Sequence, residues 1–163
     1  MRDTEGVEPE RESVWDYPRP PRVEPTAARI QVWHNGLAVA DTTRSRRVLE
    51  TSQPPVYYVP PDDVDLDLLE RSTNLTFCEW KGLATYVSVR VGDRLAPDAG
   101  WTYRDPTPAF ESIRDHYAFY AQRLDECLVA GEAVQPNEGQ FYGGWITSSV
   151  VGPFKGGPGT AGW

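Results

Sequence analysis

A two-residue turn signal constrains the fold more than any other feature of the sequence. Asn35-Gly36 lies within the stretch RIQVWHNGLAVAD, and Ile30 and Val32 precede it at the alternating spacing of a strand. Asn-Gly strongly favours the type I′ turn of a β-hairpin, because both residues readily adopt positive φ. This stretch therefore predicts two antiparallel strands joined by the turn.

Further strand signals follow along the chain as short runs of β-branched and aromatic residues bounded by Pro or Gly. We expect strands in residues 46–50, 56–60, 75–80, 83–91, 101–105 and within 116–130. Helical patterns are restricted to one or two turns after Pro60-Pro61 and to the apolar spacing of residues 108–117. The sequence thus predicts a mainly β fold with one or two short helices.

The 163 residues suit one domain with terminal extensions. We expect a Pro-rich, acidic arm over 1–26, a core domain over 27–130 and a Gly-rich extension over 131–163 that partly wraps the core. Trp15 and Tyr17 within the arm are large aromatics that dock on a surface, either their own domain or a partner. Docking on their own domain is the favoured interpretation.

The net charge of the chain limits the kinds of partner that it can bind. A formal net charge of −8 and a pI near 4.7 are atypical of proteins that bind the nucleic-acid backbone, so we expect no nucleic-acid partner. The sequence has only two lysines, Lys81 and Lys155, and each follows an aromatic residue and precedes a glycine. Either a coding bias towards Arg left them by chance, or these positions need a compact ammonium.

The sequence also bears on location and cofactors. The first residues lack the apolar segment of a signal peptide, and no run approaches the length needed to cross a bilayer. We expect a cytoplasmic protein without a membrane partner, and a homo-oligomer stays open. Cys78 and Cys127 have no Cys or His neighbour at zinc-ligand spacing, so we expect no metal and no cofactor.

Aromatic residues with polar tips gather around one lysine in the middle of the chain. Rings supply contact area in small-molecule pockets, while hydroxyl and ammonium groups fix the orientation of the ligand. The same aromatics also suit a hydrophobic core, Lys81 also suits a solvated turn, and Arg44 also suits pairing with surface acids. We expect ligand contacts from Tyr58, Lys81, Tyr86, Trp101, Tyr103 and Arg44.

Three residues are candidates for catalysis: Lys81, Cys78 and Glu50. An ammonium near Cys78 would lower the thiol pKa and favour the nucleophilic thiolate. The two histidines, His34 and His116, are distant in sequence from Cys78, and a free cysteine is commonly a small buried apolar residue. A structural role is therefore favoured for Cys78.

Four segments resemble one bacterial family, the domain of unknown function 427: VWHNGLAVADTTRSRRVLETSQPPVYYVPPDDV, TFCEWKGLATYVSV, WTYRDPTP and HYAFY. The resemblance covers residues 29–128, and the flanking segments resemble extensions of actinobacterial members. It implies a β-tent type of fold, with two antiparallel sheets that meet along an edge and a small ligand bound between them. Related folds hold zinc through cysteine pairs, which this chain lacks. Glu79 stands where the family usually has Pro.

Family motif positions coincide with most of the candidate residues: Glu50, Tyr58, Cys78, Lys81, Tyr86, Trp101 and Tyr103. The leading hypothesis is a small-molecule binding or sensing domain. An enzyme that uses Lys81 or Cys78 on a small carbonyl-type substrate is the second. An adaptor that binds a protein partner through its Trp-containing arms is the third.

Overall fold

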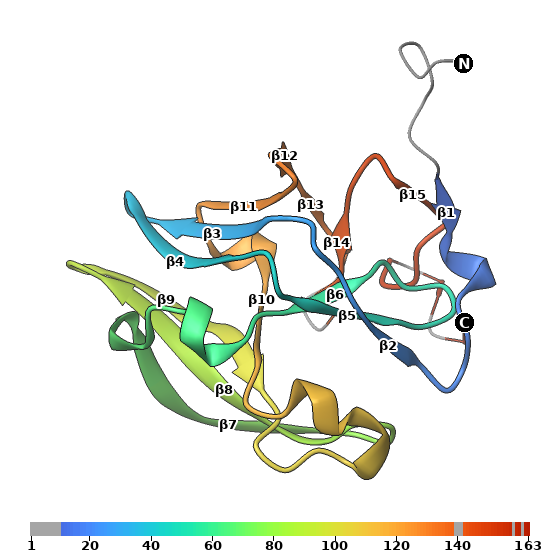
Figure 1. Cartoon of the computed structure of the whole chain (residues 1–163), viewed down its shortest axis with the longest axis horizontal. Helices are drawn as coiled ribbons and strands as arrows, with labels where there is room; N and C mark the ends of the chain where they lie inside the picture. Colours follow the sequence, from blue (N-terminus) through green and yellow to red (C-terminus); the bar gives the residue numbers. More distant parts are fainter. Residues whose placement is uncertain (1–10, 139–141, 158, 161) are drawn as a thin grey trace.

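The computed structural model describes residues 11–138, 142–157, 159–160 and 162–163. Within these residues, two four-stranded sheets and one three-stranded sheet form the body of the molecule, and two further strand pairs lie in the terminal segments. Figure 1 shows the β3–β4–β11 sheet and the β7–β8–β9 sheet on opposite sides of the body. All pairings in the three larger sheets are antiparallel, so the predicted mainly β fold is confirmed.

The first sheet has the strand order β12-β11-β3-β4. Its strands are β3 (Ile30–His34), β4 (Leu37–Thr42), β11 (Glu126–Val129) and β12 (Glu132–Ala133). The predicted hairpin joins β3 to β4: Asn35 has φ of +48° and Gly36 has φ of +84°, the left-handed values that a type I′ turn requires. Asn35 Nδ2 also donates to the carbonyl oxygen of Val91 at 3.0 Å, which attaches the turn to the second sheet.

The second sheet has the order β10-β9-β8-β7. Its strands are β7 (Leu69–Cys78), β8 (Gly82–Val91), β9 (Arg94–Thr102) and β10 (Tyr117–Phe119). Strands β7 and β9 both begin earlier in the chain than their apolar patterns indicate. The first half of β7 is polar and exposed because it lies at the sheet edge, with only β8 beside it.

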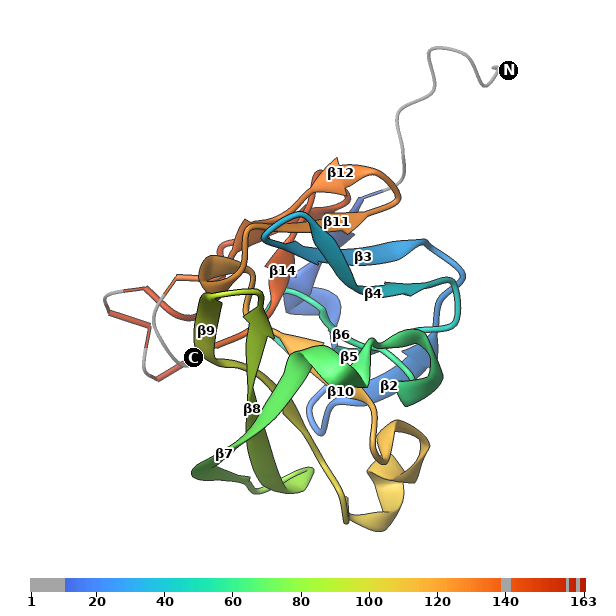
Figure 2. The same cartoon turned by 90° about the vertical axis from the view of Figure 1, so that its left-hand side faces the viewer.

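The third sheet contains β2 (Arg22–Pro25), β5 (Arg46–Leu49) and β6 (Val56–Tyr58), in the order β2-β5-β6. Figure 2 shows it between the β3–β4 hairpin and the β7–β8 hairpin. Strand β2 belongs to the expected arm 1–26, yet its whole length pairs with β5. Beyond β6, Val59 exchanges main-chain hydrogen bonds of 2.8 and 2.9 Å with Tyr117, which ties this sheet to β10.

The helical segments of the described residues are short 3-10 helices. They are η1 (Val14–Asp16), η2 (Pro61–Asp63), η3 (Leu66–Leu68), η4 (Pro108–Ile113) and η5 (Ala121–Arg123). Pro61 and Pro108 lie at the start of η2 and η4, as the sequence predicts. No helix in this part of the chain is long and apolar enough to cross a membrane.

The buried side chains form two large clusters with different compositions. One is mostly aliphatic and lies between the first two sheets, with Ile30, Val32 and Val89 fully buried in it. The other is mostly aromatic and contains Tyr58, Tyr86, Trp101, Tyr103, Phe110 and Tyr120. Tyrosine and tryptophan carry polar atoms that need hydrogen-bond partners when buried, so the aromatic cluster places polar groups inside the core.

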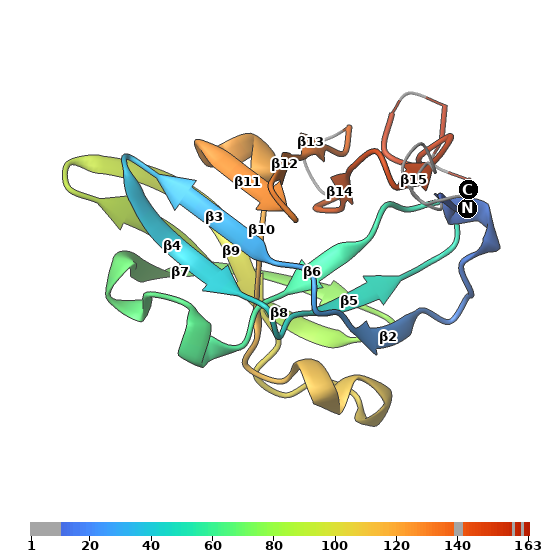
Figure 3. The ribbon, with the colours of Figure 1, turned by 45° about the horizontal axis from the view of Figure 1, so that its top comes forward.

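The N- and C-terminal segments pair with each other at one end of the molecule. Figure 3 shows β1 (Glu12–Ser13) next to β15 (Val150–Val151), and the two strands are parallel. The ring centroids of Trp15 and Trp163 are 5.3 Å apart, and Trp15 Nε1 donates to the Pro153 carbonyl oxygen at 2.8 Å. The aromatic residue of the arm therefore packs on the chain itself, with 42% of its surface still exposed.

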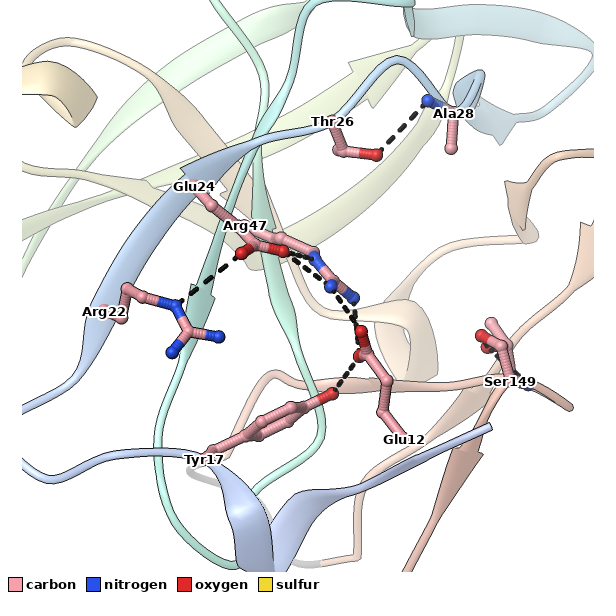
Figure 4. A network of polar contacts seen from close by, with 9 residues as sticks. Glu12, Tyr17, Arg22, Glu24, Thr26, Ala28, Arg47 and Ser149 are labelled. Carbon is pink, nitrogen blue, oxygen red and sulfur yellow. Dashed lines mark hydrogen bonds and ion pairs between the residues drawn. The ribbon is translucent and has the colours of Figure 1, made fainter. Parts of the chain in front are cut away.

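Arg47 on β5 anchors the arm. As Figure 4 shows, its guanidinium contacts two carboxylates: the Nη1 and Nη2 atoms donate to Glu12 at 3.0 and 2.8 Å, and Nε donates to Glu24 at 2.8 Å. Tyr17 donates its hydroxyl to Glu12 at 2.7 Å and is itself buried. These contacts hold the first described residues of the chain against the third sheet.

Candidate functional site

A cavity of about 220 Å³ opens at the aromatic cluster, where β6, the β7–β8 turn and the end of β9 meet. Its wall includes five of the six residues expected to contact a ligand: Tyr58, Lys81, Tyr86, Trp101 and Tyr103. The three catalytic candidates, Lys81, Cys78 and Glu50, also line it. Residues far apart in sequence thus meet at one concave site.

Strand register explains how the rings come together. Tyr86 on β8 and Trp101 on β9 are paired directly across the two strands, and their ring centroids are 6.4 Å apart. Tyr58, at the end of β6, meets Trp101 edge-on at 6.3 Å. The Trp101 ring is packed most closely by Tyr120, at 4.6 Å. Together these contacts leave the indole little room to move, so it forms a fixed surface of the cavity.

The tyrosine hydroxyls form short polar connections within this apolar site. Trp101 Nε1 donates to the Tyr58 hydroxyl oxygen at 3.2 Å. The hydroxyl of Tyr86 lies 3.1 Å from Thr76 Oγ1. Burial raises the pKa of Tyr58 and of Tyr103 above the ordinary tyrosine value of 10.0. Both phenols are therefore neutral near pH 7 and serve as hydrogen-bonding groups rather than as charges.

Lys81 lies in the turn between β7 and β8, and the main chain fixes its position. Gly82 has φ of +107°, and Thr107 N donates to the Lys81 carbonyl oxygen at 3.0 Å. The ammonium Nζ lies 5.8 Å from the centroid of the Phe110 ring, which is within the range of a cation–π contact. No carboxylate among the described residues forms an ion pair with Lys81.

Cys78 and Glu50 occupy different parts of the wall. Cys78 is the last residue of β7 and is a half-buried free thiol. Glu50 follows β5, and its carboxylate lies 3.6 Å from the guanidinium of Arg19. Neither histidine lines the cavity: His34 faces Asp125, and His116 Nδ1 is 3.0 Å from the Arg114 carbonyl oxygen. The wall therefore lacks a histidine base for the Cys78 thiol.

Arg44 lies away from the cavity. Its guanidinium forms two hydrogen bonds of 3.1 and 2.9 Å with Asp63, and Asp63 also accepts a hydrogen bond from Thr42 at 2.6 Å. Asp63 Oδ1 and Arg44 Nη2 are an ion pair at 2.9 Å. Arg44 is thus placed in a surface pair, the alternative role that its sequence context also suited.

Tyr142 and Gly143 are the wall residues that lie farthest along the chain from the predicted ones, and the sequence did not predict them. Both lie in the Gly-rich segment after residue 131, which shows no periodicity. The motif FYGGW, in which two glycines separate aromatic residues, was the one local signal of a close main-chain approach.

The ligating side chains of the described residues are dispersed. No group of three or more His, Cys, Asp or Glu side chains there is placed to hold a metal ion. The cavity wall offers aromatic rings, tyrosine hydroxyls, one ammonium, one thiol and the carboxylates of Glu50 and Glu79.

Fold and site together define a class: a mainly β protein with an aromatic, lysine-bearing cavity at the meeting point of its sheets. A family model described as "Domain of unknown function (DUF427)", with the short name NTP_transf_9, matches residues 22–130. This match covers more than half of the chain, so the protein belongs to that family. Comparison with the curated proteins returns no match.

Proposed function

We propose that this chain is a small-molecule binding domain whose cavity takes a small organic anion with an apolar body. One observation carries the proposal: the Lys81 ammonium lies at an aromatic cavity without a carboxylate partner among the described residues. A partly desolvated cation gains most from a ligand that supplies the missing negative charge. The rings of Tyr86 and Trp101 supply apolar contact for the rest of the ligand.

The charges of the wall favour a ligand with a single negative charge. Lys81 is the one basic side chain of the wall, whereas Glu50 and Glu79 are both acidic. A polyphosphate would meet these two carboxylates with only one ammonium to balance its charge. The volume of about 220 Å³ is also below the ~300–1,000 Å³ typical of pockets for drug-sized ligands. Both properties favour a compact monoanion over a nucleoside triphosphate.

Benzoate is a suitable first probe because it combines one ring with one carboxylate. Titration calorimetry at low ionic strength should show saturable binding to the full chain. Replacing Lys81 by Met keeps the length of the side chain and removes its charge, so the affinity should fall about tenfold, or ~1.4 kcal/mol. Lys81→Arg should retain part of the affinity because the charge is kept.

Arg71→Met is the matched control, since it also removes one positive charge from the β7–β8 hairpin. Arg71 is an exposed residue of β7 and does not line the cavity. Its replacement should leave the benzoate affinity unchanged. The proposal is wrong if benzoate does not bind the wild-type chain, or if Lys81→Met and Arg71→Met bind it as tightly as the wild type does.

The enzyme hypothesis keeps one supporting observation, that Lys81 and Cys78 line the same cavity. A lysine amine adds to a carbonyl carbon and loses water to give an imine, which borohydride reduces to a stable amine. Finding no such adduct on Lys81 with a panel of small aldehydes and ketones would count against this version. The adaptor hypothesis stays a prediction, with Trp15 packed on Trp163.

A further inference from the structure

The wall of the cavity extends beyond the family domain. The family match ends at residue 130, but Tyr142 and Gly143 also line the cavity. All other wall residues lie between Glu50 and Tyr103. One side of the site is therefore supplied by the C-terminal extension.

Main-chain bonds on both sides fix this part of the extension. Asn137 N donates to the Gly144 carbonyl oxygen at 3.2 Å, next to the pairing of β13 (Gln135–Pro136) with β14 (Trp145–Ile146). Trp145 N donates to the Pro55 carbonyl oxygen at 2.9 Å. The Trp145 side chain is 2% exposed, and its Nε1 donates to the Phe119 carbonyl oxygen at 2.9 Å. The wall segment is thus attached to β6 and to the core.

The extension also lies directly on the Trp101 ring. A Cβ atom added at Gly143 would overlap Cη2 of Trp101, and one added at Gly144 would lie 2.5 Å from the Pro54 carbonyl oxygen. Only glycine allows so close an approach of the main chain at either position. Because Tyr120 packs Trp101 at 4.6 Å, the indole cannot withdraw without repacking the aromatic cluster.

Tyr142 is held by the second lysine of the chain. Lys155 Nζ lies 5.6 Å from the centroid of the Tyr142 ring, and Lys155 N donates to the Ser52 carbonyl oxygen at 2.8 Å. The Tyr142 ring is half-buried and forms part of the wall. The two aromatic-Lys-Gly triplets therefore serve the same site, one through Lys81 in the wall and the other through a contact with Tyr142.

The cavity volume limits what fits behind this wall. The volume of about 220 Å³ lies below the ~300–1,000 Å³ typical of pockets for drug-sized ligands. A carboxylate with one or two fused rings therefore suits this volume better than one with three fused rings. The aromatic rings of Trp101 and Tyr86 in the wall favour an aromatic ligand, because ring–ring contacts add to the apolar contact.

We propose that the ligand is a planar aromatic carboxylate of one or two rings, and that Tyr142 is the residue that sets this size limit. The inference rests on the proposed function, because it assumes that the cavity binds an anion at Lys81. It goes further in assigning ligand selection to a segment outside the family domain.

The test uses a ladder of carboxylates that differ by one fused ring: benzoate, naphthoate and anthracenecarboxylate. Calorimetry on the full wild-type chain should show binding of the first two and no binding of the third. Tyr142→Ala removes the ring that the extension contributes to the wall, so the affinity for anthracenecarboxylate relative to benzoate should rise at least tenfold. Tyr142→Phe keeps the ring and should keep the size limit.

Gly143→Ala, with a matched control, tests the second residue that the extension contributes to the wall. Its new methyl group must displace either Trp101 or the extension, so benzoate affinity should fall at least tenfold. Gly162→Ala makes the same chemical change where no atom lies within 4 Å and should bind like the wild type. If Tyr142→Ala proves too unstable to titrate, Tyr142→Leu replaces it in the same ring-size comparison, because it also removes the ring and keeps an apolar side chain.

The outcomes separate the two proposals. Wild-type binding of benzoate that depends on Lys81, combined with an unchanged ring-size limit in Tyr142→Ala, would overturn the role of Tyr142 and leave the binding function standing. Unchanged benzoate affinity in Gly143→Ala would likewise remove the extension from the site. Failure of the wild-type chain to bind any of the three carboxylates would overturn the proposed function and this inference together.

Discussion

Arg47 joins two carboxylates that come from different parts of the chain. Glu12 belongs to β1 in the arm, whereas Glu24 belongs to β2 in the third sheet. The Arg47 side chain is 16% exposed, so the carboxylates pair with a cation that has lost much of its hydration. Hydrogen bonds from Arg47 are the largest cause that lowers the pKa of Glu12 below its ordinary value of 4.5.

This shift predicts an acid-sensitive attachment of the arm. A carboxyl group whose pKa is lower in the folded state stabilises folding above its unfolded pKa, here about 4.5. That stabilisation is lost as the pH falls through the lower, folded pKa. Urea unfolding should show the wild type more stable than Glu12→Gln at pH 7, by about 1 kcal/mol or less because Glu12 is partly exposed. The difference should disappear towards pH 3.

Glu126→Gln is the control for this comparison, since Glu126 is an exposed residue of β11 that forms no ion pair in the described structure. It should give the same stability as the wild type at both pH values. A Glu12→Gln difference that stays constant with pH would mean that the Glu12 charge does not hold the arm.

Among individual residues, the sequence predicted the site residues that stand out from their immediate neighbours in the chain. Lys81 was notable because lysine is rare in this chain and follows Trp80, and the turn between two strand patterns placed it at the end of a hairpin. Arg44 was expected to contact the ligand, but it pairs with Asp63, a contact that depends on how two separate loops pack. Tyr142 was not predicted for the same reason: it lines the cavity next to Gly143, whose main chain lies against Trp101 from more than forty residues away in the sequence.

Among the structural elements, the β3–β4 hairpin depends on its turn residues. Gly36 has φ of +84°, and no atom lies within 4 Å of where a Cβ would be. A substitution by Ala therefore introduces no clash and costs only the strain of a left-handed conformation. Gly36→Ala should lower the free energy of unfolding by about 1 kcal/mol.

Urea unfolding of Gly36→Ala, with Gly162→Ala as its control, measures this cost. Gly162 also has open space around it and is not among the residues with positive φ, so its change should stay within about 0.5 kcal/mol. Equal stability of the two variants would show that the hairpin accommodates Ala by changing its turn.

The elements that the sequence predicted and those it did not differ in how they are stabilised. The β3–β4 and β7–β8 hairpins have short breaks at Asn35-Gly36 and Lys81-Gly82 between two predicted strands, so local pattern and fold agree. The pairs β1–β15 and β13–β14 are each two residues long; β1 and β15 come from opposite ends of the chain, and the segment between β13 and β14 shows no strand pattern. Such short pairings follow from the packing of the surrounding chain, which no local pattern records.

For the molecule as a whole, the C-terminal extension is part of the core. Trp145 belongs to the same buried cluster as Ile30 and Phe119, although it lies outside the family match. Its ring centroid is 5.6 Å from that of Tyr57. The family domain and its extension therefore share one hydrophobic core, and the extension also completes the cavity wall.

Because the hydrophobic core is shared, Trp145→Ala should destabilise the whole protein. Removal of a fully buried tryptophan leaves a large void and an unpaired Phe119 carbonyl oxygen, so the free energy of unfolding should fall by about 3–5 kcal/mol. Trp163→Ala removes the same atoms from a partly exposed position against Trp15 and should cost about 1 kcal/mol. Urea unfolding followed by circular dichroism compares the two variants on one scale. If both lost the same small amount, the extension would be a separate layer on a self-sufficient family domain; a loss several-fold larger for Trp145 means that the fold requires residues beyond 130.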